Sequence, residues 1–323
     1  MDKMEKNNRM QVTIPLKGGD LVLKNPILTA SGTFGYGVEF SHYGDLSSLG
    51  GIVTKGLSLK PMKGNPQPRI AETAAGMLNA IGLQNWGVEY FLENYLPKLP
   101  VEKLPVVANI YAHSPEDFSA LAARLAPVPG IAALEVNISC PNVACGGVLF
   151  GQDPKLAFEV TRVVKQASGN LPVMVKLSPN VTSITEIALA CEEGGADMLS
   201  CINTLTGMAV DVKGRRPALA NVVGGLSGPA IKPVALRCVW QVASAVKIPV
   251  IGVGGIYCAD DILEFLLVGA HAVQVGTANF NRPNKVFELP AELEDRMNKL
   301  KIDNLQSYRG TLEIPMVKSW DEL

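Results

Sequence analysis

Eight short runs rich in β-branched and aliphatic residues recur along the chain, and each is followed by a segment that is compatible with a helix. The runs span residues 27–31, 51–55, 105–111, 132–139, 173–178, 196–204, 249–255 and 271–277. Between them lie amphipathic stretches such as 115–125, 154–166, 183–193, 233–246 and 260–267, several of which begin at a Ser, Asp or Pro start signal. Apolar strands that alternate with helices indicate a parallel sheet buried on both faces. Eight is also the number of strands that closes a (β/α)8 barrel.

Polar residues gather where these runs end, which favours a closed barrel over an open, doubly wound sheet. They are Ser31, Lys55, Asn109, Asn137, Lys176, Asn203, Gly254, Gly255, Gly276 and Thr277. In a barrel the carboxyl ends of all strands converge on one mouth, where catalytic groups lie. The first strand also lacks the G-x-G-x-x-G turn of a dinucleotide-binding sheet. We therefore predict an α/β protein with a single-domain (β/α)8 TIM barrel over residues 1–323, in which residues 203–232 form a long loop over the mouth.

The composition indicates a globular protein. Of the 323 residues, 47% are hydrophobic and 18% are charged, and the formal net charge is −1. The sequence has no basic stripe of the kind that binds nucleic acid, no apolar run near the roughly 18 residues of a membrane span, and no signal-peptide h-region at its start. The six cysteines and three histidines show no zinc or iron–sulfur spacing. We expect a cytoplasmic protein without a metal site.

Glycines end the last two strands, in the runs GVGG (252–255) and VGT (275–277), and a further Ser-Gly pair lies at 227–228. In barrels these loops commonly bind a phosphate through backbone N–H groups, and glycine lets the backbone approach an anion closely. The sequence therefore predicts a phosphorylated ligand. The alternative is that these glycines only form tight turns.

Lysines and asparagines occur at the same level of the predicted barrel. Lys55 and Lys176 end apolar strands, which suits an anionic ligand group or a cofactor that gains negative charge on reduction, unless the side chains extend to solvent. An amide side chain both donates and accepts hydrogen bonds. Several of them would therefore match a planar ring with alternating N–H and C=O groups, such as a pyrimidinedione. The asparagines are Asn79, Asn109, Asn137, Asn142 and Asn203.

Cys140 follows a strand in the run LEVNISCPNVACGGVLFG (134–151). No histidine lies close to it in sequence, as a cysteine nucleophile would require, and it has no partner ligands for a metal. A thiol pKa of about 8.5 can be brought towards neutrality by an electropositive pocket, so general acid–base chemistry is possible. From the residues alone a base, a nucleophile and a small structural residue all stay open.

Taken together, these runs resemble class 1 dihydroorotate dehydrogenases along nearly all of residues 12–281. The matching runs are NPILTASGTFGYG, GIVTKGLSLKPMKGNPQPRI, MLNAIGLQNWG, NISCPNV, INT, GGLSGPAIKP, GVGGI and VGTANF. The GTFGYG run, TKG and the block RIAETAAGMLNAIGLQN are similar to the class 1B branch, the NAD-dependent catalytic subunits. The class 2 type has a membrane-associating extension and a serine at the position of the cysteine, and this chain has neither.

The resemblance implies FMN-dependent oxidation of (S)-dihydroorotate to orotate in de novo pyrimidine (UMP) biosynthesis. Cys140 as a thiolate would remove the C5 proton while C6 delivers hydride to flavin N5, and Lys176 would stabilise the charge of the reduced flavin. The implied contacts of one FMN per chain are Ser31, Lys55, Gly56, Asn109, Asn137, Lys176, Ile202, Gly228, Gly254, Gly255, Gly276 and Thr277. The implied substrate contacts are Lys55, Asn79, Ala80, Ile81, Gly82, Leu83, Asn137, Asn142, Asn203 and Thr204.

The resemblance also implies a partner. Class 1B members pair with an electron-transfer subunit that carries FAD and a 2Fe–2S cluster and passes electrons to NAD⁺, so we expect a homodimer of this chain within a heterotetramer. The alternatives are a class 1A homodimer that reduces fumarate, a dihydropyrimidine dehydrogenase-like subunit, and a non-catalytic FMN-binding barrel. Cys145 is expected to be an incidental loop residue. The tail after Phe280 is expected to form a helix that closes the outside of the barrel.

Overall fold

All eight runs predicted as strands form strands, and they pair side by side in one parallel sheet. The fold was obtained as a computed structural model, in which residues 9–139 and 150–314 are described. The strands are β3 (Ile27–Thr29), β4 (Ile52–Val53), β7 (Val106–Ile110), β8 (Ile131–Asn137), β9 (Val173–Leu177), β10 (Met198–Cys201), β15 (Val250–Val253) and β16 (Ala272–Val275).

The sheet closes on itself. Its order is β3-β16-β15-β10-β9-β8-β7-β4, and the two end strands meet through a parallel bridge between Leu28 and Gly51. The N–H of Gly50 also donates to the carbonyl of Ile27 at 2.8 Å. Closure leaves no unpaired edge in the barrel and brings the carboxyl ends of all eight strands to one mouth. The predicted (β/α)8 barrel is thereby confirmed.

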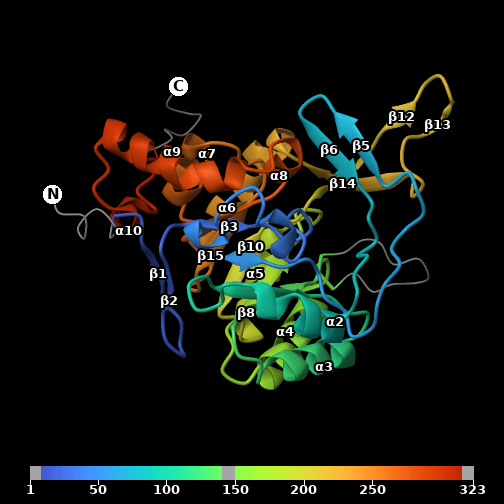
Figure 1. Ribbon diagram of the computed structural model, residues 1–323, viewed down its shortest axis with the longest axis horizontal. Helices are drawn as coiled ribbons and strands as arrows, with labels where there is room; N and C mark the ends of the chain where they lie inside the picture. Colours follow the sequence, from blue (N-terminus) through green and yellow to red (C-terminus); the bar gives the residue numbers. More distant parts are fainter. Residues whose placement is uncertain (1–8, 140–149, 315–323) are drawn as a thin grey trace, which may run out of the picture.

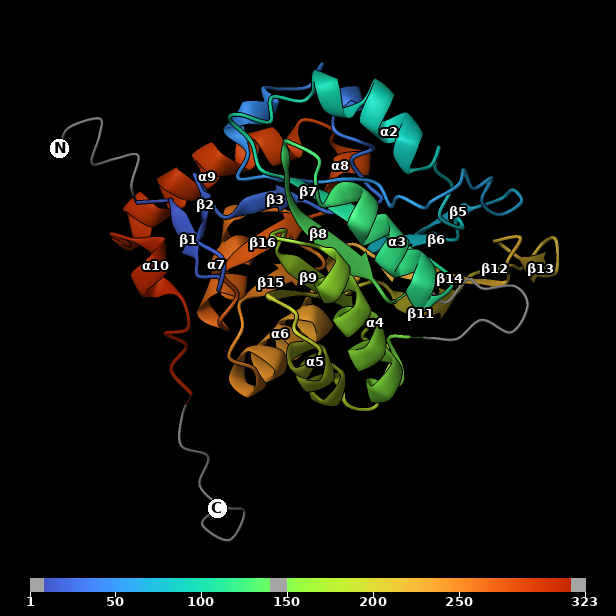
Figure 2. The same cartoon turned by 90° about the horizontal axis from the view of Figure 1, so that it is seen from below.

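The helices lie outside these strands, as Figures 1 and 2 show. Each of the first three predicted helices begins at a capping side chain, since Ser114, Asp153 and Ser183 each accept a backbone N–H of the first helical turn. The five predicted helices are confirmed as α3 (Pro115–Leu125), α4 (Pro154–Ala167), α5 (Ile184–Glu193), α6 (Lys232–Ala245) and α7 (Ala259–Leu267). The remaining helices are α2 (Val88–Asn94), α8 (Ala278–Asn281), α9 (Lys285–Leu300) and α10 (Leu305–Tyr308), with short 3₁₀ turns at Val38–Phe40, Leu46–Ser48, Leu96–Lys98 and Pro229–Ile231. Helix α9 packs on β3 and α7, so the expected helix in the tail is confirmed.

The segment 203–232, predicted as one long loop over the mouth, contains four strands, and the prediction of an irregular loop was wrong. Strands β11 (Leu205–Met208) and β14 (Val223–Ser227) join β6 (Gly76–Asn79) and β5 (Ile70–Thr73) in a four-stranded sheet of order β11-β14-β6-β5. The strands β12 (Val210–Asp211) and β13 (Arg216–Pro217) form a separate hairpin. We call the four-stranded sheet the top sheet, and Figure 1 shows it standing at one end of the barrel. It forms because β14 pairs with β6, which is distant in sequence.

A second hairpin closes the opposite end of the barrel. Strands β1 (Val12–Ile14) and β2 (Leu21–Leu23) pair antiparallel, and their apolar side chains pack with the inward-facing residues at the amino ends of the barrel strands. Val12, Ile14 and Leu23 are at most 3% exposed. Below the mouth the barrel therefore has an apolar floor, and a ligand reaches its interior from the mouth alone.

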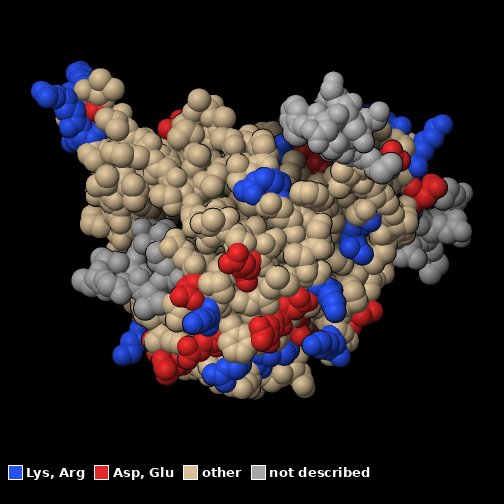
Figure 3. Space-filling model, turned by 180° about the vertical axis from the view of Figure 1, so that it is seen from behind, with Lys and Arg blue, Asp and Glu red and all other residues tan. Residues whose placement is uncertain are grey.

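The surface carries both signs of charge. On the face seen in Figure 3, lysines and arginines are interspersed with aspartates and glutamates over the lower part, and much of the upper part is uncharged. No basic stripe of the kind that binds nucleic acid crosses this face. Among residues 9–139 and 150–314 there is no helix whose length and apolar character would let it cross a membrane.

Candidate active site

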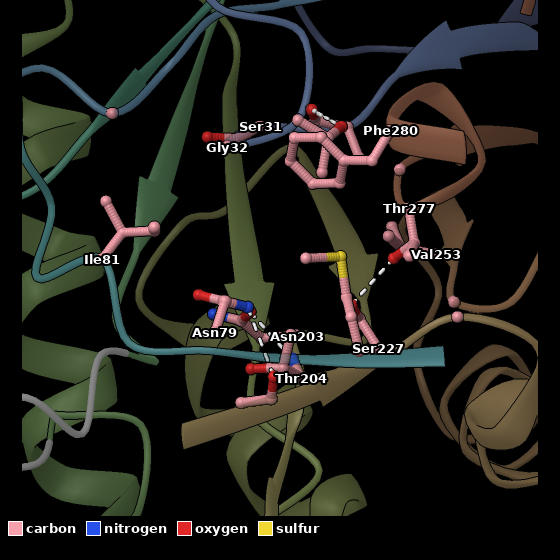
Figure 4. Close-up of a pocket in the computed structure, with 18 of the residues that line it drawn as sticks. Ser31, Gly32, Asn79, Ile81, Asn203, Thr204, Ser227, Val253, Thr277 and Phe280 are labelled. Atoms are coloured by element: carbon pink, nitrogen blue, oxygen red, sulfur yellow. Dashed lines mark hydrogen bonds between the residues drawn. The ribbon is translucent and has the colours of Figure 1, made fainter. Parts of the chain in front are cut away.

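A cavity of about 400 Å³ opens between the mouth of the barrel and the top sheet. Its walls come from the ends of the barrel strands, where Lys55, Lys176 and Gly254 lie, and from the top sheet, which contributes Asn79 and Ser227. This volume falls within the range of small-molecule sites. Figure 4 shows Asn79, Asn203 and Thr204 grouped on one side of the cavity.

The cavity brings together most of the residues that the sequence singled out. The residues on its wall are Ser31, Lys55, Gly56, Asn79, Ile81, Gly82, Leu83, Asn137, Lys176, Ile202, Asn203, Thr204, Gly228, Gly254, Gly255, Gly276 and Thr277. Two further candidates, Cys140 and Asn142, lie outside the described residues, as does Cys145. The roles assigned to all of these residues stay predictions.

Two candidates lie behind the cavity wall. Ala80 is 1% exposed and does not line the cavity. Asn109 is also fully buried, and a Cβ on the wall residue Gly56 would meet its Oδ1 at 3.1 Å. That oxygen accepts no hydrogen bond within the described part of the chain. Because an unpaired buried carbonyl oxygen is costly, the Asn109 Oδ1 is an acceptor that calls for a donor from outside the described residues.

Glycines form one end of the cavity in backbone conformations that other residues adopt only under strain. Gly228, Gly254 and Gly255 have φ angles of +98°, +130° and +75°. A Cβ on Gly255 would also lie 2.7 Å from the Cβ of Lys232. Next to them, the hydroxyl of Thr277 donates to that of Ser227 at 2.8 Å, a contact drawn in Figure 4. This end therefore offers uncovered backbone and two hydroxyl groups, which suits a phosphate.

Amide side chains form the opposite wall, and they are held by the top sheet and by one another. The Nδ2 of Asn79 donates to the carbonyl of Gly225 at 3.3 Å, and the Nδ2 of Asn203 lies 3.5 Å from the Oδ1 of Asn137. The Oδ1 of Asn203 accepts the N–H of Thr204 at 2.8 Å. These contacts fix the amides as a set of directed donors and acceptors, as a planar heterocycle would require.

Lys55 is a cation in the cavity without a protein counter-ion in the described ranges. Burial lowers the pKa of Lys55, the Glu39 carboxylate partly offsets this, and the Arg69 guanidinium lowers it further. The other lysine of the cavity, Lys176, is paired with the Glu135 carboxylate at 3.7 Å. An anionic ligand group beside Lys55 would stabilise the charged form that burial disfavours.

Glu135 is the residue that the sequence reasoning missed. It is fully buried in the barrel beneath the cavity, and its carboxylate accepts from Asn109, Ser200 and Gln274 at 2.6, 2.8 and 2.6 Å. The sequence did contain a signal for it, since Glu135 is the one charged residue in the predicted strand run 132–139. A charge in a strand buried on both faces has to be paired inside the barrel. Phe280, which also lines the cavity, gave no such signal.

The described part of the chain contains no group of three or more His, Cys, Asp or Glu side chains that is arranged to hold a metal ion. The cysteines Cys191, Cys201 and Cys238 are buried. Burial raises the pKa of each of these thiols. Among the described residues, the polar groups on the cavity wall are its lysines, amides, hydroxyls and glycine backbone.

Comparison with known proteins agrees with these features. The family model for dihydroorotate dehydrogenase matches residues 14–297. The dihydroorotate dehydrogenase B (NAD(+)) catalytic subunit of Solidesulfovibrio magneticus is 61% identical over 94% of this chain and 100% of its own length. The proteins of the same name from Maridesulfovibrio salexigens and Geobacter sulfurreducens are 61% and 57% identical, over 95% and 91% of this chain and 100% and 96% of their own lengths. The chain therefore belongs to the dihydroorotate dehydrogenase family.

Proposed function

We propose that this chain is the catalytic subunit of an NAD⁺-linked dihydroorotate dehydrogenase, which oxidises (S)-dihydroorotate to orotate with the help of FMN. The observation that carries the proposal is the polarity of the cavity. One end is a glycine turn suited to phosphate and the opposite wall carries the amides of Asn79 and Asn203, while Lys55, which also lines the cavity, has no counter-ion in the described ranges. The names of full-length relatives at 61% identity support the same reading.

FMN fits the residues that are present. Gly228, Gly254, Gly255, Gly276 and Thr277 would hold its phosphate, since their backbone is uncovered towards the cavity. The Oδ1 of Asn109, which is buried and unpaired within the described residues, needs a hydrogen-bond donor, and an N–H of the flavin ring would supply it. Ser31, Gly56, Asn137 and Ile202 would line the ring, and Lys176 would lie beside it. Bound FMN supplies the acceptor for the hydride that leaves the substrate.

The substrate is recognised by charge at one edge and by amides at the other. Lys55 would pair with the carboxylate of dihydroorotate, because that pairing stabilises the charged form that burial disfavours. Asn79, Asn137, Asn203 and Thr204, together with Asn142 outside the described residues, would hold the N–H and C=O groups of the ring. The backbone from Ala80 to Leu83 would pass beside the carboxylate. Fixing the ring in this way turns binding energy into positioning of the two C–H bonds that break.

We assign the removal of the C5 proton to Cys140, which lies outside the described residues. A thiolate beside cationic side chains is a competent general base, and such a base typically contributes about 10²–10⁴-fold to the rate. The electrons would then pass to NAD⁺ through a partner subunit that carries FAD and a 2Fe–2S cluster. The printed names of the relatives, which call them catalytic subunits, support a partner. We place the assembly, a heterotetramer, in the cytoplasm and in pyrimidine biosynthesis, with residues 1–323 of this chain as one FMN-binding domain.

The test is to add dihydroorotate anaerobically to the purified flavoprotein and to follow the absorbance of the flavin. We expect bleaching in the wild type and slowing by about 10²–10⁴-fold in Cys140→Ala, with FMN still bound. Cys145→Ala serves as the matched control from the same loop and should bleach at the wild-type rate. A wild-type protein that does not bleach would contradict the proposed activity. Efficient fumarate reduction by this chain alone, without a co-purifying subunit, would instead identify a class 1A enzyme.

A further inference from the structure

Glu135 occupies the centre of a buried polar network directly beneath the candidate active site. Its partners come from four different barrel strands. Asn109 from β7, Ser200 from β10 and Gln274 from β16 donate hydrogen bonds, and Lys176 from β9 forms an ion pair. Glu135, Asn109, Ser200 and Gln274 are all fully buried, and Lys176 is 5% exposed. We infer that Glu135 is a positioning residue of the flavin site, which orients the amide of Asn109 and moderates the charge of Lys176. This inference rests on the proposed function, because it assumes a flavin above these two residues.

The Glu135 carboxylate sets the direction of the Asn109 amide. An ionised carboxylate only accepts hydrogen bonds, so the side chain facing it must do so with its nitrogen. The Nδ2 of Asn109 accordingly donates to the Oε2 of Glu135 at 2.6 Å. This leaves the Oδ1 of Asn109 turned away, unpaired and next to Gly56 of the cavity wall. Glu135 therefore fixes Asn109 with its acceptor oxygen towards Gly56 of the cavity wall. Without the carboxylate charge, the amide is free to turn over and present a donor instead.

The Glu135 carboxylate also moderates the charge of Lys176. Its Nζ lies 3.7 Å from the Oε2 of Glu135, and its side chain lines the cavity. A positive charge there favours the reduced cofactor, which carries more negative charge than the oxidised one. The Glu135 carboxylate opposes that effect. Its negative charge is close to the site and buried in a medium of low dielectric constant, where charges interact strongly. Glu135 therefore holds the reduction potential below the value that Lys176 alone would set.

The far oxygen of the carboxylate is held separately. Its Oε1 accepts from Ser200 at 2.8 Å and from Gln274 at 2.6 Å, so the carboxylate is braced from the side opposite to Asn109 and Lys176. Neither Ser200 nor Gln274 lies on the wall of the cavity that the described residues form. This division offers a matched control. Removing the Ser200 hydroxyl loosens the network and leaves the two contacts on Oε2 in place.

The experiment compares Glu135→Gln, Glu135→Asp and Ser200→Ala with the wild type in two measurements. One is the FMN dissociation constant, from titration of the apoprotein followed by flavin fluorescence. The other is the midpoint potential, from anaerobic equilibration with a reference dye. We expect Glu135→Gln to move the two-electron equilibrium at least tenfold towards the reduced flavin, which is about 30 mV, and to weaken FMN binding at least tenfold. Glu135→Asp keeps the negative charge but moves it away from Lys176 by the length of one methylene group. It should therefore shift the midpoint potential in the same direction as Glu135→Gln, but by a smaller amount. Ser200→Ala should shift the equilibrium by less than twofold.

A purely structural role gives a different result. Glu135→Gln would then lower the melting temperature while the midpoint potential stayed at the wild-type value, and this would overturn the inference. If Glu135→Gln does not fold, the comparison of Glu135→Asp with Ser200→Ala decides, because equal potentials in these two variants would also overturn it. A wild-type apoprotein that takes up no FMN would refute the proposed function and this inference together. FMN uptake with no effect of Glu135 would refute the inference alone.

Discussion

His271 predicts a loss of stability in mild acid that originates far from the candidate active site. It lies directly before β16, at the end of the barrel opposite to the mouth, and its Nδ1 accepts the N–H of Val250 at 3.4 Å. Burial, together with the nearby Arg309 guanidinium, lowers the pKa of His271 to about 4. Substituting this histidine by glutamine removes the titration and keeps a polar side chain of similar length.

The magnitude follows from linkage between protonation and folding. A histidine in the unfolded chain has a pKa of about 6.5. Above that pH the imidazole is neutral in both states, and its contribution to stability is fully present. As the pH falls from 6.5 towards the folded pKa of about 4, the unfolded state alone takes up the proton, and stability is lost. The loss amounts to about 2 kcal/mol between pH 7 and pH 5, an upper figure because the side chain is partly exposed.

The assay is urea unfolding followed by tryptophan fluorescence at pH 7 and pH 5. We expect the wild type to lose about 2 kcal/mol more than His271→Gln between these two pH values. His42→Gln is the matched control, since His42 is exposed, and it should lose as much as the wild type. Equal losses in the wild type and in His271→Gln would refute the reasoning.

Three further predictions follow from the glycine turn, the unpaired lysine and the barrel floor. Gly255→Ala, at φ +75°, should weaken FMN binding about 5- to 100-fold through backbone strain, whereas Gly18→Ala, in open space, should leave the FMN dissociation constant unchanged in a fluorescence titration. Lys55→Met should weaken orotate binding about 10- to 100-fold by calorimetry. It should also abolish the proton uptake that accompanies orotate binding at a pH just below the ordinary lysine pKa of about 10.4. A proton uptake that survives the substitution would argue against the pairing of Lys55 with the orotate carboxylate. Leu23→Ala, at 0% exposure, should cost about 2–5 kcal/mol in urea unfolding with FMN affinity retained, and a loss below about 1 kcal/mol would mean that the hairpin does not seal the floor.

The barrel could be predicted from the sequence because its signals are local. Each strand is an apolar run that ends in a residue such as Asn137 or Lys176, and these residues lie together at the mouth of the barrel. The top sheet could not be predicted in this way. Asn79 and Gly225 face each other across β6 and β14, yet they are 146 positions apart. No local pattern in the segment 203–232 reports such a pairing.

The limits of prediction in the candidate site have the same origin. Gln274 donates to Glu135 from 139 positions away, so the sequence shows a charge in an apolar strand and does not show what pairs with it. Asn109 was expected at the cavity surface and lies one layer behind it, because Gly56 stands in front. The alternation along a strand tells which side chains point into the barrel. How deep each one lies depends on the register between neighbouring strands.

The hairpin β1–β2 that forms the floor of the barrel lies early in the chain, and hydrogen bonds to residues 302–306 hold it in place. The Arg9 guanidinium donates to the carbonyls of Ile302 and Asp303, and the Gln306 side chain bonds to the backbone of Thr13, across separations of 293 and 294 positions. On a ribosome that adds about 5–20 residues per second, the hairpin emerges roughly 15–60 s before its fastening partners. During that interval the apolar residues of the hairpin have no anchor at the carboxyl end of the chain. We therefore expect this barrel to become resistant to proteases only after residues 302–306 have been synthesised.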